Sequence, residues 1–308
     1  MKTGRYRVVA FVCACLAALA ASQPAQGDPP RVRTDMLVTT DWLARHLDDS
    51  DIVIVDVAKA RTGYDKEHIP GARLLLWDEI VTTRDGIPNE IPPVERLVEI
   101  VRRLGITDAS RVILYDEEMG LSAARAYVTF DYLGLGEHAS LLDGQWKRWR
   151  REERPVVAES TAVKPSTFEP QLHPQVVASL GKVRDLVEKR QEAASAIIDA
   201  RPAEQYAGNE AGDGVGRPGH IPGASSIPWT QNILSADDPA LRPLDELRAV
   251  YANAGVMPGR PAIAYCRTGV QAAYTYFTLR YLGYNPQLYD GSFIEWSAQN
   301  NLPIERSR

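Results

Sequence analysis

The chain has 308 residues, of which 44% are hydrophobic and 24% are charged, and its formal net charge is -5. These values are ordinary for a folded globular protein and argue against a disordered or fibrous chain. A mildly acidic chain lacks the clustered Lys and Arg on which sequence-independent binding of nucleic acid depends, so we expect no nucleic-acid partner. At roughly 100–200 residues per domain, the length suggests two domains.

The N-terminal residues have the layout of a secretory signal peptide. Basic residues come first, residues 8–21 are almost wholly apolar, and small residues surround the end of that run. We therefore expect residues 1–22 to be a signal peptide that is cleaved on export to the periplasm or the extracellular space. After cleavage we expect no stable membrane association. The alternative is an uncleaved N-terminal anchor.

Cleavage would leave one of the three cysteines. Cys13 and Cys15 lie in the expected signal peptide, so Cys266 would be alone in the mature chain. Exported proteins usually pair their cysteines or lack them, so a solitary one is either an inert buried thiol or a reactive group. No cluster of His and Cys has metal-ligand spacing.

The rest of the chain contains two copies of one pattern, about 150 residues apart, which indicates duplicated globular domains rather than a solenoid. The segment His68–Ala72 recurs with the same five residues as His220–Ala224. Other matching pairs are 52–56 with 196–199, 111–115 with 261–265, 132–134 with 281–283, and 142–144 with 289–291.

The repeat gives domain boundaries. We assign residues 23–36 to an N-terminal linker, 37–155 to a first domain, and 174–308 to a second domain that carries the cysteine. Residues 156–173 are rich in Pro, Ser and Thr and are predicted to link the two.

Within each copy, short apolar runs alternate with segments of helical spacing. Runs such as Ile52–Val55 are rich in Val and Ile, as the buried strands of a parallel sheet are. Residues 97–104 and 244–251 carry apolar side chains at helical spacing, and Gly105 and Gly255 follow them. The expected fold class is α/β, with two tandem domains that are each a parallel sheet with helices on both faces.

The loop after residues 261–265 is the best candidate for chemistry, because functional groups of such sheets lie beyond the carboxyl ends of the strands. It consists of Cys266, Arg267, Thr268, Gly269, Val270 and Gln271. Backbone N–H groups, the dipole of the following helix and Arg267 would all favour the thiolate of Cys266, which is the nucleophilic form. Gly269 suits a sharp turn with positive φ.

The same loop in the first copy has the opposite charge. Residues 116–122 contain three carboxylates, and Asp116 stands where Cys266 stands in the second copy. Such a loop should hold an anion poorly. We therefore expect the first copy to have kept the fold and lost the chemistry, and Cys266 to be the catalytic nucleophile.

Taken together, these segments make the chain similar to the two-domain rhodanese family, the thiosulfate and 3-mercaptopyruvate sulfurtransferases. The resemblance extends from about Met36 to Pro303. It implies a ping-pong reaction between small molecules, in which Cys266 takes a sulfane sulfur from a donor as a persulfide. An acceptor such as cyanide or a thiol then removes the sulfur. The resemblance implies no metal or organic cofactor.

The cysteine loop lies between the two donor types of the family. Thiosulfate-type members resemble Cys-Arg-Lys-Gly-Val-Thr, and mercaptopyruvate-type members resemble Cys-Gly-Ser-Gly-Val-Thr. Arg267 matches the first type and suits a dianion. Thr268 is closer to the serine of the second type, and Gln271 matches neither. We expect residues 267–271 to bind the substrate and thiosulfate to be the donor, with 3-mercaptopyruvate as the alternative.

Two more arginines are candidates for substrate binding. Arg201 ends an Asp-x-Arg segment and either binds substrate or pairs with an acid. In the family an arginine four positions later can bind substrate, but this chain has Gln205 there, which weakens the match to thiosulfate-type members. Arg217 could supply the missing charge.

The remaining polar residues of the repeat are assigned structural roles. His68 and His220 occur in both copies although only one copy has the cysteine, so a general base is the poorer explanation. Asp56 and Asp199 are interpreted as strand-end acids that orient a turn.

Two other functions fit part of this pattern. Tyrosine phosphatases also place a thiolate before a helix, but they need an arginine six positions after the cysteine, where this chain has Ala272. A persulfide relay or redox-sensing module would use Cys266 with little turnover and would pass its sulfur to a protein thiol acceptor. Turnover separates the relay from the enzyme.

Overall fold

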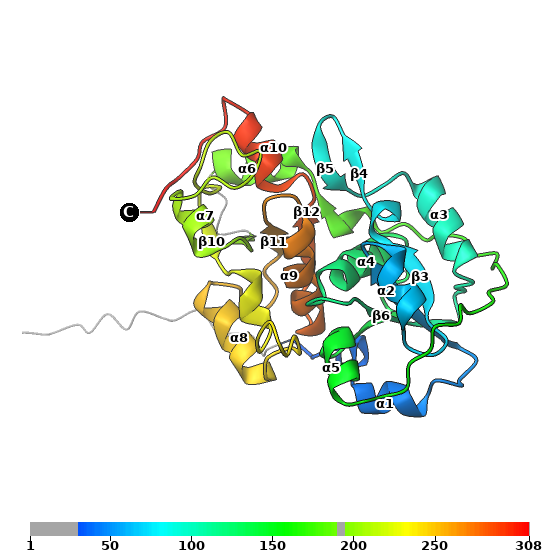
Figure 1. Cartoon of the computed structure of the whole chain (residues 1–308). Coiled ribbons are helices and arrows are strands. Elements are labelled where there is room, and N and C mark those ends of the chain that lie inside the picture. The colour runs from blue at the N-terminus through cyan, green and yellow to red at the C-terminus, as the bar shows by residue number, and fades with distance from the viewer. Residues whose placement is uncertain (1–29, 190–194, 308) are drawn as a thin grey trace, which may run out of the picture.

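The computed structural model describes residues 30–189 and 195–307, so the expected signal peptide at residues 1–22 lies outside the described part. Two halves of the same architecture lie side by side (Figure 1). Each half contains a five-stranded parallel sheet, with strand order β1-β7-β6-β2-β3 in the first and β8-β12-β11-β9-β10 in the second. Corresponding strands therefore hold corresponding places, and the predicted pair of α/β domains is confirmed.

Apart from the β4–β5 hairpin, which only the first half has, the helices and strands follow one another in the same order in both halves. The first half contains β1 (Leu37–Val38), α1 (Thr40–Arg45), β2 (Ile52–Ala58), α2 (Arg61–Lys66), β3 (Arg73–Leu76), β4 (Thr82–Arg84), β5 (Ile87–Glu90), α3 (Val94–Arg103), β6 (Arg111–Tyr115), α4 (Leu121–Tyr132), β7 (Ala139–Leu142) and α5 (Gln145–Arg151). The second half contains β8 (Val177–Ala178), α6 (Leu180–Glu188), β9 (Ala196–Asp199), α7 (Ala203–Ala207), β10 (Ala224–Ser226), α8 (Leu244–Asn253), β11 (Ala262–Tyr265), α9 (Val270–Tyr281), β12 (Pro286–Tyr289) and α10 (Ser292–Ala298).

Helices cover both faces of each sheet because successive strand residues point to opposite sides. In β2, the side chains of Val53, Val55 and Val57 pack with residues of α3 and α4. Those of Ile54 and Ala58 pack with residues of α1, α2 and α5. The second sheet repeats this division, with α8 and α9 on one face and α6 and α10 on the other.

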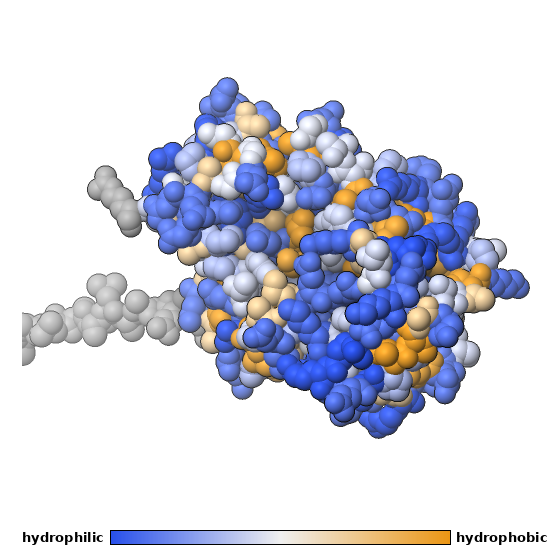
Figure 2. Space-filling view, viewed as in Figure 1, coloured by the Kyte–Doolittle hydropathy of each residue, from blue (hydrophilic) through white to orange (hydrophobic). Residues whose placement is uncertain are grey.

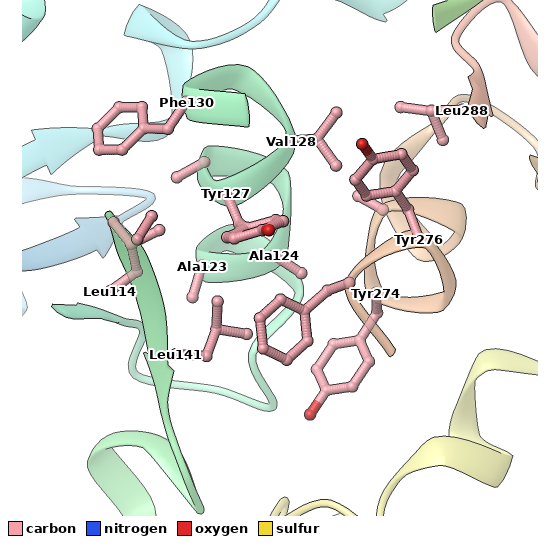
Figure 3. Close-up of a cluster of buried hydrophobic side chains, with 14 of the residues drawn as sticks. Leu114, Ala123, Ala124, Tyr127, Val128, Phe130, Leu141, Tyr274, Tyr276 and Leu288 are labelled. Atoms are coloured by element: carbon pink, nitrogen blue, oxygen red, sulfur yellow. The ribbon is translucent and has the colours of Figure 1, made fainter. Parts of the chain in front are cut away.

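The two halves share one hydrophobic core. Helix α4 packs against α9, and the buried cluster around them contains residues from both sheets. Figure 3 shows Tyr127 and Val128 of α4 facing Tyr274 and Tyr276 of α9. The rings of Tyr127 and Phe277 meet edge to face, with 5.0 Å between their centroids. The interface is therefore built like the interior of a domain.

A short antiparallel hairpin, β4–β5, extends from the first half toward the second (Figure 1). Asn89 of this hairpin contacts the cysteine loop, and Ile91, which follows the hairpin, contacts the turn beside that loop. Asn89 Nδ2 donates to Thr268 Oγ1 at 3.1 Å, and the backbone N–H of Ile91 donates to Asp290 Oδ2 at 2.7 Å. The first half thus takes part in building the neighbourhood of Cys266.

The molecular surface is mainly hydrophilic on the face shown in Figure 2, with scattered apolar patches. Over the described residues, no helix combines the length and the apolar composition needed to cross a membrane.

Candidate active site

Cys266 lies directly after β11, at the carboxyl end of the central strands of its sheet. Residues 266–271, the Cys266 loop, lead from there into α9. The turn is made by Gly269, whose φ of +79° strains any residue with a side chain. A Cβ at this position would also lie only 3.0 Å from the carbonyl oxygen of Asp290. Both features require glycine, as the sequence predicted for this turn.

The backbone of the Cys266 loop is fixed by the start of α10. The N–H of Cys266 donates to Ser292 Oγ at 3.2 Å, and this hydroxyl donates to the carbonyl of Tyr289 at 2.8 Å. The N–H of Phe293 donates in turn to the carbonyl of Cys266 at 2.9 Å. Cys266 itself is buried, with 1% of its surface exposed.

The first half contains a corresponding loop with a different occupant, and this loop is one residue longer between Asp116 and Gly120 than the second-half loop between Cys266 and Gly269. The carboxylate of Asp116 accepts four backbone hydrogen bonds within its own loop. Its Oδ1 accepts from Glu118 and Gly120, both at 2.9 Å, and its Oδ2 accepts from Ser122 at 2.9 Å and Ala123 at 3.2 Å. Burial raises the pKa of the Asp116 carboxyl, and these four hydrogen bonds oppose that rise. We call the four N–H groups the nest.

This arrangement supplies a physical reason why the loop of the first half should bind an external anion poorly. The acidic loop does hold an anion, and that anion is a side chain of the loop itself. Glu118 points away and pairs with Lys59, with 3.1 Å between Glu118 Oε1 and Lys59 Nζ. What the first half lacks is the cysteine and a nest that is open to another anion.

The two loops are anchored in the same way. The N–H of Asp116 donates to Gln145 Oε1 at 3.0 Å, as that of Cys266 donates to Ser292 Oγ. Gln145 and Ser292 both have positive φ, at 55° and 53°. The Cys266 loop therefore offers a nest equivalent to that of the first half.

The equivalent N–H groups of the second half are free to bind a ligand. Those of Thr268, Gly269, Gln271 and Ala272 have no acceptor within the part of the chain that the structure describes. Such groups at a helix start and a sharp turn attract anions. An anion on or beside the Cys266 sulfur would take the place that the Asp116 carboxylate takes in the first half.

Arg267 brings a full positive charge to the rim of this site. Its Nη1 donates to the carbonyl of Asp213 at 2.8 Å. A Cβ on Gly212 would touch both Arg267 Cδ, at 3.2 Å, and Gln205 Oε1, at 3.3 Å. Arg267 and Gln205 therefore both lie against Gly212. The side chain beside the arginine of the loop is thus the uncharged amide of Gln205.

The remaining residues of the loop shape it. Thr268 is 4% exposed and accepts the hydrogen bond from Asn89. Val270 and Gln271 are half-buried and begin α9.

Arg201 pairs with an acid, which is one of the two roles that the sequence left open. Its Nε and Nη2 donate to the carboxylate of Asp199, and Nη2 also donates to the carbonyl of Gly219 at 2.7 Å. Burial lowers the pKa of Arg201, but Asp199 outweighs this and raises it overall. Nη1 is buried without a hydrogen-bond partner among the described residues.

Arg217 has a role away from the loop. Its guanidinium donates to the carbonyls of Ser297 at 2.9 Å, Gln299 at 2.5 Å and Leu302 at 3.0 Å. These carbonyls lie at the carboxyl end of α10, whereas Cys266 contacts the amino end, roughly 10 Å away along a seven-residue helix. The charge of Arg217 stabilises the helix end, and its hydrogen bonds among the described residues go there and not to the Cys266 loop.

The histidines take the structural places that the repeat indicated. His220 Nδ1 lies 2.8 Å from the carbonyl of Tyr206, and its ring stacks on the Tyr206 ring at 3.7 Å. His68 repeats both contacts with Tyr64, at 2.7 Å and 3.7 Å. Neither forms a hydrogen bond to its loop. Over the described residues, no group of His, Cys, Asp and Glu side chains could hold a metal ion.

The sequence did not single out four residues that the structure places around the Cys266 loop: Asn89, Arg125, Asp290 and Ser292. Arg125 gave one usable signal, because a charged residue within the apolar pattern of residues 121–132 needs a buried partner. Asp290 lies within the repeated segment 289–291 and Ser292 follows it, but the repeat alone indicates no role for either residue at the loop. Nothing local distinguishes Asn89.

A model of the rhodanese-like domain matches residues 39–152 and again residues 182–299. The chain belongs to the rhodanese family. The two matches fall on the two halves, so both are rhodanese domains, and only the second carries the loop cysteine.

Several relatives align with this rhodanese over nearly the whole of their own length. It is 33% identical over 284 residues to 3-mercaptopyruvate sulfurtransferase of Escherichia coli K12, which covers 88% of this chain and 98% of that protein. It is 31% identical over 286 residues to the sulfur carrier protein TtuD of Thermus thermophilus, with 88% and 97% covered. A protein of Mycolicibacterium smegmatis with the provisional name thiosulfate sulfurtransferase is 31% identical over 289 residues, with 89% and 98% covered.

Among solved structures, SseA from Escherichia coli, described with the 3-mercaptopyruvate sulfotransferases, matches with a TM-score of 0.72 and 31% identity. The match covers 83% of this chain and 98% of SseA. This kinship identifies the chain as a sulfurtransferase of the rhodanese family. It does not distinguish between the sulfur donors.

Proposed function

We propose that this rhodanese transfers a sulfane sulfur from thiosulfate to a small thiophilic acceptor such as cyanide, through a persulfide on Cys266. The observation that carries the proposal is the pair of loops. In one half, four N–H groups enclose the carboxylate of Asp116. In the other, a cysteine stands at the same place, and the equivalent N–H groups have no acceptor in the described chain.

The Asp116 carboxylate is a good geometric guide to a persulfide. Its oxygens lie two bonds beyond Cβ, which is also where the terminal sulfur of a Cys266 persulfide would lie. The nest would therefore stabilise the negative charge of that sulfur with backbone hydrogen bonds. Because the donors are already in place, little reorganisation would be needed when the charge arrives.

The reaction has two displacements. The Cys266 thiolate attacks the outer sulfur of thiosulfate, forming one S–S bond while the bond to the sulfite group breaks. Sulfite leaves with that electron pair, and Cys266 carries a persulfide anion. Cyanide then attacks the terminal sulfur, the S–S bond breaks, and thiocyanate leaves as the thiolate returns. No proton transfer is needed in either step, which agrees with the structural roles of both histidines.

Thiosulfate is favoured as donor by Arg267, whose guanidinium could bind a dianion at the rim of the loop. The alternative, 3-mercaptopyruvate, is favoured by the Thr268 hydroxyl and by Gln205, because fewer charges suit a monocarboxylate. A sulfur relay to a protein thiol is favoured by the 31% identity to the sulfur carrier protein TtuD.

Steady-state assays of the chain from residue 23 onward separate these functions. Thiocyanate formation would be followed with thiosulfate and with 3-mercaptopyruvate, and Cys266→Ser should lower turnover by more than about a thousandfold. Arg267→Gln should lower kcat/KM for thiosulfate by about ten- to a hundredfold, since a charge-assisted hydrogen bond is lost, and should affect mercaptopyruvate less. Equal losses for both donors would contradict the assignment of thiosulfate. No turnover with either donor would favour the relay.

We further propose that residues 1–22 direct export to the periplasm or beyond and are then removed. The mature chain would carry Cys266 as its only cysteine, without an intramolecular partner for a disulfide. The intact mass of the protein recovered outside the cytoplasm should match a chain that begins near residue 23. A mass that includes Cys13 or Cys15 would contradict cleavage.

A further inference from the structure

Arg125 is a charged residue of the first half that reaches the active site of the second. It lies in α4, where its side chain is 0% exposed. Its Nη1 donates to Asp290 Oδ1 at 2.6 Å, and its Nη2 donates to the carbonyl of Asn89 at 2.5 Å. Burying a guanidinium is costly unless its partners are well placed, so this position calls for an explanation beyond packing.

The partner of Arg125 belongs to the turn that anchors the Cys266 loop. Asp290 lies between β12 and α10, and its other oxygen, Oδ2, accepts from the N–H of Ile91 at 2.7 Å. Two residues later, Ser292 Oγ accepts the hydrogen bond from the N–H of Cys266. The first half therefore holds both oxygens of the carboxylate that precedes the anchor.

The ion pair also lies directly against the Cys266 loop. A Cβ on Gly269 would be 3.0 Å from Asp290 Oδ1 and 3.2 Å from Arg125 Nη1. Beside it, Asn89 donates to the hydroxyl of Thr268, while its own carbonyl accepts from Arg125. Contacts from the first half thus meet two consecutive residues of the loop that forms the nest.

The matching place in the other half shows what is special here. The N–H of Leu241 donates to Asp143 Oδ1 at 2.9 Å, as that of Ile91 does to Asp290. However, the residue that meets Gly120, the counterpart of Gly269, is Tyr274, whose Cε2 lies 2.7 Å from the position of a Cβ. Each half therefore holds the aspartate of the other half in the same way. The difference is that a guanidinium, that of Arg125, contacts the loop with the cysteine, whereas a tyrosine ring contacts the loop without one.

We propose that Arg125 is a positioning residue for sulfur transfer: by fixing Asp290 and the β12–α10 turn, it holds the Cys266 loop with its N–H groups directed at the sulfur. This inference rests on the proposed function of Cys266. It gives the half without a cysteine a part in the reaction, since the intact ion pair can form only when both halves are docked.

The test compares Arg125→Gln with the wild-type chain in two measurements. The first is thiocyanate formation, in which we expect kcat to fall by about ten- to a hundredfold while KM for the donor changes little, because a misplaced loop impairs chemistry more than donor binding. The second is the rate of alkylation of Cys266 by iodoacetamide as a function of pH. Its midpoint should move to higher pH, because less well directed N–H groups favour the thiolate less.

A matched control is Arg148→Gln. Arg148 pairs with Asp143 at 3.2 Å and with Asp238 at 3.0 Å, and so stabilises the corresponding turn beside the loop without a cysteine. This variant should keep the wild-type kcat and alkylation profile even if it lowers the melting temperature. If Arg125→Gln does not fold, Arg125→Lys keeps the charge beside Asp290 and should give a smaller shift of the same kind.

Three results would overturn the proposal. Arg125→Gln or Arg125→Lys could leave kcat and the alkylation profile unchanged, or they could raise only KM. The third result is a loss of kcat that is proportional to the loss of stability, with the same proportion in the Arg125 and Arg148 variants. Alkylation needs no sulfur donor, so a wild-type chain without turnover would count against the proposed function, whereas the alkylation profiles would still decide the role of Arg125.

Discussion

At the scale of single residues, one position takes two chemical roles in one chain. Asp116 and Cys266 directly follow equivalent strands, and their N–H groups donate to side chains at equivalent positions, yet one fills its nest and the other leaves it open. The sequence located both positions. It predicted backbone N–H groups that favour the Cys266 thiolate, but it could not reveal that the matching groups of the first half enclose the Asp116 carboxylate, because backbone N–H groups carry no residue-specific signal. It also could not show that Arg217 binds carbonyls at the carboxyl end of α10, because those contacts span 80 or more residues.

A second pair of equivalent residues leads to a prediction about how the free energy of unfolding depends on pH. Asp56 and Asp199 hold equivalent places in the two sheets, but β2 continues for two residues beyond Asp56, whereas β9 ends at Asp199, so the strand-end position expected for Asp56 is wrong. Asp199 is paired with Arg201, whereas Ala58 stands at the matching place beside Asp56. Burial raises the pKa of Asp56 to about 7, opposed by the hydrogen bond from Tyr115. The folded chain therefore holds a proton that the unfolded chain, with an ordinary pKa near 3.8, releases.

Because the folded-state pKa is raised, this stabilising term is present at low pH and is lost as the pH rises from about 4 to about 7. Asp56→Asn removes the term. The variant should gain stability relative to wild type by an amount on the order of 3 kcal/mol between pH 4.5 and pH 8. Chemical denaturation at several pH values measures this. Asp199→Asn is the control and should lose about 3–5 kcal/mol, since it leaves Arg201 buried without its carboxylate. A pH-independent effect of Asp56→Asn would contradict the account.

At the scale of elements, the two loops and the helices that follow them depend on left-handed glycines. The sequence predicted a turn before the helix from Gly269 and predicted the helices at 97–104 and 244–251, because these are local patterns. It could not predict that Asn89 of the β4–β5 hairpin or Arg125 of α4 would meet the Cys266 loop. Those contacts depend on how α4 docks on α9, which no single segment encodes.

Two glycine substitutions separate folding from chemistry at this scale. Gly269→Ala and Gly120→Ala should each cost at least about 1–2 kcal/mol, since φ is +79° and +86° at these positions. Thermal melting measures that cost. Only Gly269→Ala should also lower the rate of thiocyanate formation, because it displaces the loop from Asp290. Equal effects of both variants on turnover, at equal stability, would contradict the view that the first-half loop takes no part in chemistry.

At the scale of the whole molecule, the repeat is a pair of domains joined through a common core. Helices α4 and α9 contribute to one buried cluster with strands of both sheets, as Figure 3 shows for Leu114, Leu141 and Leu288. The duplication was visible in the sequence, and so was the loss of the cysteine from one copy. The continuity of the core was not, because an apolar helix face looks the same whether it covers its own sheet or a neighbouring domain.

This continuity predicts cooperative unfolding. Phe277→Ala removes a fully buried ring that meets Tyr127 of the other half, and it should cost about 3–5 kcal/mol. Both variant and wild type should unfold in a single transition that is the same by tryptophan fluorescence and by circular dichroism. Two separate transitions in the wild-type chain would show that the halves are independent and would contradict a common core.

The most direct test of the central claim is the mass of the protein after a single exposure to donor. The chain from residue 23 onward would be reduced, incubated with thiosulfate or 3-mercaptopyruvate, freed of donor and weighed intact. The account predicts a gain of one sulfur atom on Cys266, its absence in Cys266→Ser, and its release as an equal amount of thiocyanate when cyanide is added. A folded chain with a free Cys266 thiol that gains no sulfur from either donor would contradict the account.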